Sequence, residues 1–122
     1  MARILIVDDS PTETYKFREI LEKHGHHVLE AANGADGVAV ARAEHPDLVL
    51  MDVVMPGLNG FQATRQLTKG PDTAEIPIVI VTTKDQETDR VWGKRQGAKD
   101  YLTKPVDEDV LIRTVDRLLT GE

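Results

Sequence analysis

The chain has 122 residues, of which 40% are hydrophobic and 30% are charged, as expected for one globular domain and not for a disordered or fibrous chain. Its net charge of −6 argues against sequence-independent binding of nucleic acid, and the absence of cysteine excludes disulfides and zinc–thiolate sites. No apolar run approaches the roughly 20 residues of a membrane span, and the apolar stretch after Arg3 is too short for the signal peptide of a secreted protein, so we expect none. We therefore expect a soluble, cytoplasmic protein with a single domain over residues 1–122 and no membrane insertion.

Strand-like and helix-like segments alternate along the sequence. Short β-branched or Leu-rich runs predict strands at Ile4–Val7, His27–Glu30, Leu48–Met51, Ile78–Val81 and Tyr101–Thr103. Helices are predicted around residues 17–24, over 34–43, 61–69 and 85–96, and around 111–119. Such alternation predicts an α/β fold, in which right-handed crossovers build a parallel sheet covered by helices on both faces. The first, third and fourth strands are apolar enough to be central, whereas His27 and Glu30 suit an edge strand.

Polar residues gather where the predicted strands end. Four segments contribute to this set, which consists of Asp8, Asp9, Asp52, Thr82, Thr83 and Lys104. Because ligands bind beyond the carboxyl ends of the strands in an open parallel sheet, we expect these side chains to lie together. Three carboxylates about 4 Å apart repel one another by several kcal/mol at an effective dielectric near 20. Lys104 and a bound Mg²⁺, which prefers oxygen ligands, would neutralise them.

An aspartate in such a site can do more than bind metal. A carboxylate can act as a nucleophile and form an aspartyl phosphate, a reaction that mainly needs positioning and positive charge around the phosphoryl oxygens. Mg²⁺ and Lys104 would supply the charge, and the Thr82 hydroxyl would donate a hydrogen bond. The added phosphoryl charge would draw Thr82 and its loop inward, which predicts a switch.

Four segments of the sequence resemble the successive signatures of two-component response-regulator receiver domains. They are ILIVDDS at 4–10, LMDVVMP at 50–56, VTT at 81–83 and YLTKP at 101–105. The resemblance covers the whole chain in order and at the usual spacing. It implies a flavodoxin-like, doubly wound fold, with a five-stranded parallel sheet in the order 2-1-3-4-5 and five helices.

The resemblance also implies a role for each site residue. Asp52 would be the phosphoacceptor, and Asp8, Asp9, Asp52 and the backbone carbonyl of Val54 would hold Mg²⁺. Lys104 and Thr82 would bind the phosphoryl group. Thr83, which stands where the family often has Ala or Gly, would crowd the phosphoryl pocket or form a hydrogen bond in it. Tyr101 would change rotamer with the switch, and the Lys104–Pro105 peptide bond would be cis. The output surface would include Val91, Trp92, Tyr101 and Val106.

The implied partners are a histidine kinase or histidine phosphotransfer domain as phosphoryl donor and an output protein that the sequence does not identify. Within the family, the chain is most similar to the single-domain regulators of chemosensory systems that control type IV pilus (twitching) motility. It would be a monomer and not an enzyme, apart from its own phosphotransfer and dephosphorylation. We expect no fused DNA-binding domain.

Other functions remain open at this point. The chain could be a phosphate sink, a flagellar-type chemotaxis regulator or an interaction module that is never phosphorylated. A Mg²⁺-dependent phosphatase with an aspartyl intermediate is disfavoured, because that class typically has a second acid two residues after the nucleophile, where this chain has Val54.

Some of these residues also have simpler structural explanations. Asp9 or Ser10 can cap the helix that begins at Pro11. The three histidines around Gly25 suit a solvated turn better than a metal site. Val91 and Trp92 could pack on the sheet or form an interface, and the sequence does not decide between these.

Overall fold

Five strands and five helices alternate along the chain in the computed structural model, which describes residues 1–121. In chain order they are β1 (Arg3–Val7), α1 (Pro11–Lys23), β2 (His27–Ala31), α2 (Gly34–Glu44), β3 (Leu48–Met51), α3 (Gly60–Lys69), β4 (Ile78–Thr82), α4 (Glu87–Arg95), β5 (Asp100–Thr103) and α5 (Glu108–Leu119). All ten predicted elements are confirmed, and the strand ends differ from the prediction by one residue at most. No helix within residues 1–121 is long and apolar enough to cross a membrane.

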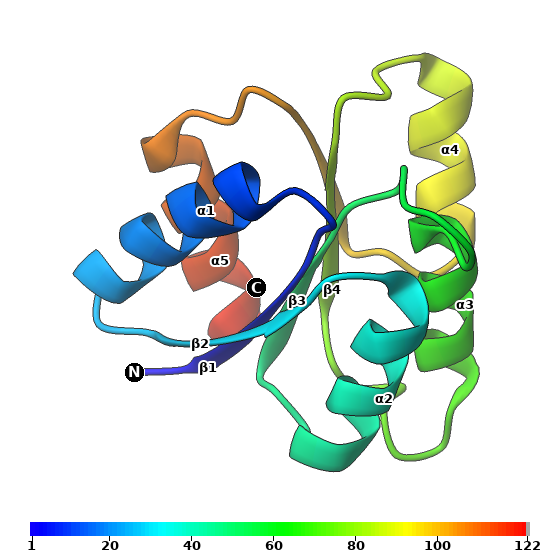
Figure 1. Cartoon of the computed structure of the whole chain (residues 1–122), viewed down its shortest axis with the longest axis horizontal. Helices are drawn as coiled ribbons and strands as arrows, with labels where there is room; N and C mark the ends of the chain where they lie inside the picture. Colours follow the sequence, from blue (N-terminus) through cyan, green and yellow to red (C-terminus); the bar gives the residue numbers. More distant parts are fainter. Residues whose placement is uncertain (122) are drawn as a thin grey trace.

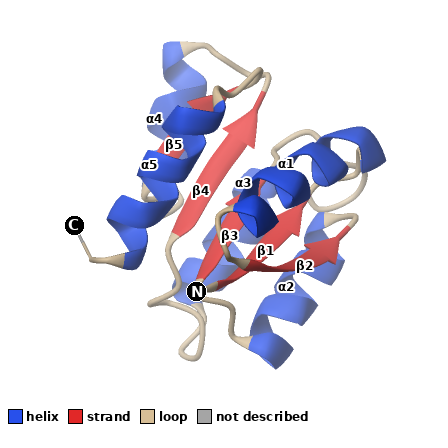
Figure 2. Cartoon of the chain, turned by 90° about the vertical axis from the view of Figure 1, so that its left-hand side faces the viewer, coloured by secondary structure: helices blue, strands red, loops and turns tan. Residues whose placement is uncertain are grey.

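The strands form one parallel sheet in the order β2-β1-β3-β4-β5, as predicted (Figure 2). β1, β3 and β4 are central and almost wholly buried, whereas β2 is an edge strand with His27 and Glu30 exposed. The chain turns outward from β1 to β2 and then crosses back to β3, so the strand order reverses between β1 and β3. A crevice at this reversal is the usual ligand position in such folds.

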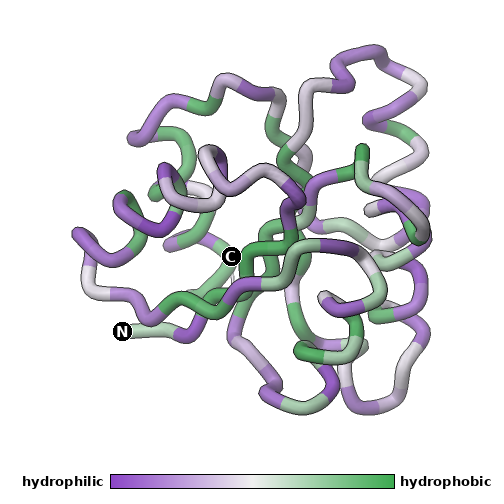
Figure 3. Tube along the Cα trace, in the orientation of Figure 1, coloured by the Kyte–Doolittle hydropathy of each residue, from purple (hydrophilic) through white to green (hydrophobic). Residues whose placement is uncertain are grey.

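Helices cover both faces of the sheet (Figure 1). On one face, Phe17 and Leu21 of α1 and Leu111 and Val115 of α5 pack with the buried side chains of the strands. On the other face, α2 and α3 pack against the sheet, and a smaller cluster around Ile80 and Tyr101 lies where α4 covers β5. The apolar residues follow the strands through the middle of the molecule (Figure 3). Apolar packing on both faces therefore holds the sheet in place, and the polar residues lie at its carboxyl edge.

Candidate functional site

The strand register brings the predicted acids together. Val7 pairs with Met51 in adjacent strands, so Asp8 and Asp52 leave the sheet side by side. One carboxylate oxygen from each of Asp8, Asp9 and Asp52 lies within 4.8 Å of the others. Asp8 and Asp52 are buried, and Asp9 is exposed. The acidic cluster is therefore a half-sheltered group of oxygen ligands that opens to solvent on the Asp9 side.

Lys104 reaches into this cluster from the end of β5. Its Nζ lies 2.8 Å from Asp8 Oδ2 and 3.7 Å from Asp52 Oδ2. Burial lowers the pKa of Lys104, but the hydrogen bond to Asp8 and the charges of Asp52 and Asp8 outweigh it and hold this pKa above its ordinary value. Lys104 therefore stays charged, and one cation faces three carboxylates.

The surroundings of Asp52 raise the pKa of its carboxyl group. Burial raises its pKa, and the charge of Asp8 adds to the rise, while Lys104 and hydrogen bonds from the Val53 amide and the Thr82 hydroxyl oppose it. The Val53 N–H donates to Asp52 Oδ1 at 2.8 Å, which orients the carboxylate. A Cβ on Gly60 would lie 1.9 Å from the Asp52 carbonyl oxygen, so only glycine lets α3 begin against this strand end. The surrounding backbone thus fixes where the carboxylate points.

The donor set suits a hard divalent cation. Carboxylates and backbone carbonyls are the ligands that Mg²⁺ accepts, and the cluster has an excess of negative charge that such an ion would neutralise. The Ser10 N–H donates to Asp8 Oδ1 at 2.9 Å and so orients this carboxylate. Ser10 also caps α1 through its hydroxyl, so the helix-cap explanation of this segment is correct for Ser10 and compatible with a metal site.

Thr82, Lys84 and Tyr101 connect the cluster to the surface beside α4. Thr82 is fully buried at the end of β4, and the Lys84 N–H donates to its Oγ1 at 3.4 Å. The Tyr101 hydroxyl donates to the Lys84 carbonyl at 2.7 Å. Burial, followed by the charge of Asp89, raises the pKa of Tyr101 to about 12, so the hydroxyl remains a donor. Thr83 is exposed, and the Lys104–Pro105 bond is cis as expected.

The residues predicted for an output surface divide into two pairs. Val91 and Trp92, on α4, are 44% and 50% exposed, which decides the open question in favour of a surface position. Tyr101 and Val106 are only 3% and 7% exposed. Val106 packs with Leu111 of α5 in the main core, because the chain turns inward before that helix begins. In this structure, therefore, only the α4 pair contributes surface.

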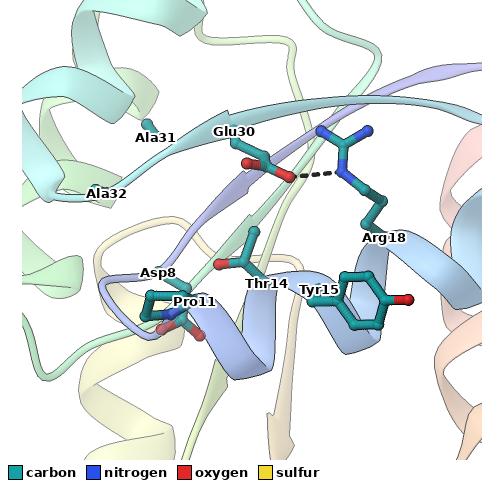
Figure 4. Close-up of a pocket in the computed structure, with 8 residues that line it drawn as sticks. All are labelled: Asp8, Pro11, Thr14, Tyr15, Arg18, Glu30, Ala31 and Ala32. Atoms are coloured by element: carbon teal, nitrogen blue, oxygen red, sulfur yellow. Dashed lines mark hydrogen bonds and ion pairs between the residues drawn. The ribbon is translucent and has the colours of Figure 1, made fainter.

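Two features were not predicted from the sequence. A cavity of about 460 Å³ lies beside Asp8, between α1 and β2, where Arg18 Nε and Glu30 Oε2 are 2.6 Å apart (Figure 4). Its lining comprises Asp8, Pro11, Thr14, Tyr15, Arg18, Glu30, Ala31 and Ala32. In addition, the His26 side chain is 9% exposed and accepts a hydrogen bond from the Ala2 N–H, so the solvated-turn prediction is wrong for this residue. Both arise from contacts between distant segments.

Comparison with known proteins accounts for this arrangement. The profile of the response regulator receiver domain matches residues 4–116. Protein PilH of Pseudomonas aeruginosa PAO1 is 74% identical over 121 residues, which cover 99% of this chain and 100% of that protein. The solved receiver domain of sensor histidine kinase PA1611 from P. aeruginosa PAO1, with a magnesium ion coordinated in its active site cleft, matches at TM-score 0.91 and 30% identity over 98% of each chain. Chemotaxis protein CheY4 of Vibrio cholerae matches at TM-score 0.90 and 31% identity over 96% of this chain and 98% of that one. The chain belongs to the response regulator receiver domain family.

Proposed function

We propose that this response regulator accepts a phosphoryl group on Asp52, with Mg²⁺ bound, from a histidine kinase or a histidine phosphotransfer domain. The observation that carries the proposal is the position of Lys104, which lies between Asp8 and Asp52 at the reversal of the sheet. A lysine that served only to neutralise one acid would not need to reach both. The magnesium ion described for the PA1611 receiver supports the metal assignment.

The roles of the residues follow from their chemistry. A carboxylate oxygen of Asp52 attacks phosphorus, an acyl phosphate bond forms, and the bond to the donor's imidazole nitrogen breaks. Asp8, Asp9, Asp52 and the carbonyl of Val54 would hold Mg²⁺, which would supply positive charge to the phosphoryl oxygens. The Lys104 ammonium adds to that charge, and the Thr82 hydroxyl donates a hydrogen bond to an oxygen of the group.

The output of the switch is protein binding by the exposed Val91 and Trp92 of α4. An exposed tryptophan beside an aliphatic side chain is a frequent anchor of protein interfaces. The identity to PilH over the whole chain supports a place in a chemosensory system that controls pilus-based motility, and the protein would act in the cytoplasm, where kinases have ATP. The phosphatase alternative is not favoured, because Val54 offers no acid beside Asp52.

The first experiment is incubation with acetyl phosphate and Mg²⁺, followed by measurement of the intact mass. The parent chain should gain one phosphoryl group in a Mg²⁺-dependent way, and Asp52→Asn should gain none. Asp47→Asn is the matched control, because Asp47 is an exposed acid before β3, at the opposite end of that strand from Asp52. An adduct in Asp52→Asn, or none in a parent chain that binds Mg²⁺, would remove the phosphoacceptor role.

A second experiment tests the pathway. The chain is expressed in P. aeruginosa that lacks PilH, and surface motility is compared with that of the intact strain. We expect the parent chain to restore the motility that the deletion changes and Asp52→Asn to fail. Restoration by neither, with both chains present at normal levels, would contradict the assignment to pilus motility while leaving the phosphoacceptor role intact.

A further inference from the structure

Arg90 of α4 makes three contacts with β5 that the receiver function does not explain. Its guanidinium carbon lies 5.3 Å from the centroid of the Tyr101 ring. One terminal nitrogen donates to the Tyr101 carbonyl at 3.4 Å, and the other donates to Thr103 Oγ1 at 2.7 Å. The planar fork of an arginine can make these contacts at once, which a lysine cannot do.

Tyr101 is held from the opposite side as well. Its hydroxyl donates to the Lys84 carbonyl, and the Lys84 amide donates to the Thr82 hydroxyl. The ring is therefore held by Arg90 over its face and by the Lys84 carbonyl at its hydroxyl, with only 3% of the residue exposed. An outward movement of the ring would break its contact with the Arg90 guanidinium and its hydrogen bond to Lys84 together.

The rest of α4 offers little to hold the helix in place. Gly93 is the one buried residue of α4, and a Cβ there would lie 2.9 Å from Ile80 Cδ1 and 3.0 Å from Tyr101 Cδ2. The helix can therefore approach β5 closely, but it inserts no large apolar side chain into the core. Arg90 becomes the main polar connection between α4 and the strand that ends at Thr103, one residue before Lys104.

We propose that Arg90 is a positioning residue, which holds Tyr101 in its buried place before any phosphoryl group is on Asp52. A second part of the proposal rests on the proposed function. A phosphoryl group on Asp52 would draw Thr82 toward it and so move the loop that contains Lys84. The Tyr101 hydroxyl is hydrogen-bonded to that loop, so the buried position of the ring and the phosphorylated state of Asp52 would stabilise each other. If the chain accepts the phosphoryl group mainly while the ring is buried, a variant with fewer buried-ring molecules takes it up more slowly, so Arg90 should also promote phosphoryl uptake.

The position of the ring can be measured without phosphorylation. The chain has two tyrosines, so Tyr15→Phe leaves Tyr101 as the only tyrosine in NMR spectra of protein labelled with ¹³C on the tyrosine ring. In that background, Arg90→Ala should lower the ratio of buried to solvent-facing ring about tenfold, which corresponds to about 1.4 kcal/mol. Arg90→Lys should recover part of the ratio, because it keeps a cation over the ring but loses the fork.

Arg95→Ala is the matched control, because Arg95 is an exposed cation on the same helix that makes no ion pair within residues 1–121. It should leave the Tyr101 signals unchanged. Equal signals in Arg90→Ala, Arg95→Ala and the parent would overturn the positioning role. If Arg90→Ala does not fold, as judged by circular dichroism, the comparison of Arg90→Lys with the parent decides in the same way.

Phosphoryl uptake from acetyl phosphate tests the second part. We expect Arg90→Ala to be phosphorylated several-fold more slowly than the parent and Arg95→Ala to match the parent. Equal rates in a variant whose ring has moved would overturn the coupling while the positioning role stands. If no variant and no parent chain is phosphorylated, the proposed function has failed, and the ring measurement still decides the role of Arg90.

Discussion

The charged side chains at the two ends of the sheet differ in their exposure to solvent. At the amino end, Arg3 Nη2 lies 2.8 Å from Glu44 Oε1, and the backbone N–H of Arg3 donates to Asp47 Oδ2. At the carboxyl end, Lys104 pairs with the carboxylates of Asp8 and Asp52, and Asp9 adds a third carboxylate to the cluster. The first arrangement is exposed, so solvent screens its charges and it contributes little to stability. The second is half-buried and has an excess of negative charge, which costs folding free energy unless a cation binds.

This difference separates residues that support the fold from residues that serve a ligand. Excess charge of one sign in a sheltered place is costly, so it indicates a site that binds a ligand of opposite charge. The acidic cluster satisfies that condition and the amino end does not. The comparison can be tested by making the same chemical change at both ends.

Neutralising the lysine of the site should have the largest effect. Without Mg²⁺, Lys104→Gln should lower the free energy of unfolding by about 2 kcal/mol, less than the 3–5 kcal/mol of a fully buried pair. It should also bind Mg²⁺ several-fold more tightly, because Lys104 competes for the oxygens of Asp8. Urea unfolding and isothermal calorimetry measure the two effects.

Arg3→Gln is the counterpart at the amino end. It should cost roughly 0.5 kcal/mol and leave Mg²⁺ affinity unchanged, because its partner Glu44 is exposed. A similar cost for both variants would mean that the carboxyl end is not special in its electrostatics. Weaker Mg²⁺ binding by Lys104→Gln would mean that the lysine assists the metal.

Neutralising Asp52 should change the free energy of unfolding in the opposite direction. Burial and Asp8 raise the pKa of Asp52, so its ionised form destabilises the folded chain. Asp52→Asn should therefore raise the free energy of unfolding by on the order of 1 kcal/mol without Mg²⁺. It should also lose most of the stabilisation that Mg²⁺ gives the parent. Thermal unfolding with and without Mg²⁺ provides the measurement.

The same substitution at Asp47 should destabilise slightly, because that carboxylate accepts the Arg3 N–H. A stabilised Asp47→Asn together with a destabilised Asp52→Asn would reverse the comparison between the two ends.

The smallest effect concerns pH at the amino end. Burial lowers the pKa of His26, and the amino terminus and His24 add to this, while Asp116 opposes it. The folded chain therefore binds this proton less readily than the unfolded chain does. The contribution of neutral His26 to the free energy of unfolding is complete above the ordinary histidine pKa near 6.5 and is lost as pH falls below it. Because the charge of Asp116 offsets part of the effect of burial, we expect at most a few tenths of a kcal/mol.

The measurement compares urea unfolding of the parent, His26→Gln and the exposed His27→Gln at pH 7.5 and 5.5. His26→Gln should lose less stability on acidification than the other two chains. An equal loss in all three would show that other groups control the acid side of the stability profile.

The sequence was sufficient to predict the fold and the acidic cluster, because both depend on local patterns. Apolar runs located the strands, and parallel strands of similar length bring Asp8 and Asp52 to one edge whatever the details of packing. The residues that were missed depend on the rotation of a helix or on a long-range contact. The polar sequence of α4 does not specify which side faces β5, so the contact of Arg90 with Tyr101 could not be predicted.

Two further differences have the same physical origin. Val106 is apolar and follows Pro105, which fits a surface or a core position equally well until α5 is placed. His26 lies in a polar turn, and its burial depends on Ala2 and Asp116 from the two ends of the chain. In each case, the sequence supplied the residue type and the tertiary structure supplied the neighbour.

The glycine contact of α4 has a consequence for how the molecule opens. A helix that buries only Gly93 can separate from the sheet without exposing a large apolar side chain, so its local unfolding costs less than that of α1, which buries Phe17 and Leu21. The backbone amides of α4 should therefore exchange with deuterium well before those of α1. Natural variation at position 93 would then change how often α4 opens locally and leave the overall melting temperature largely unaltered.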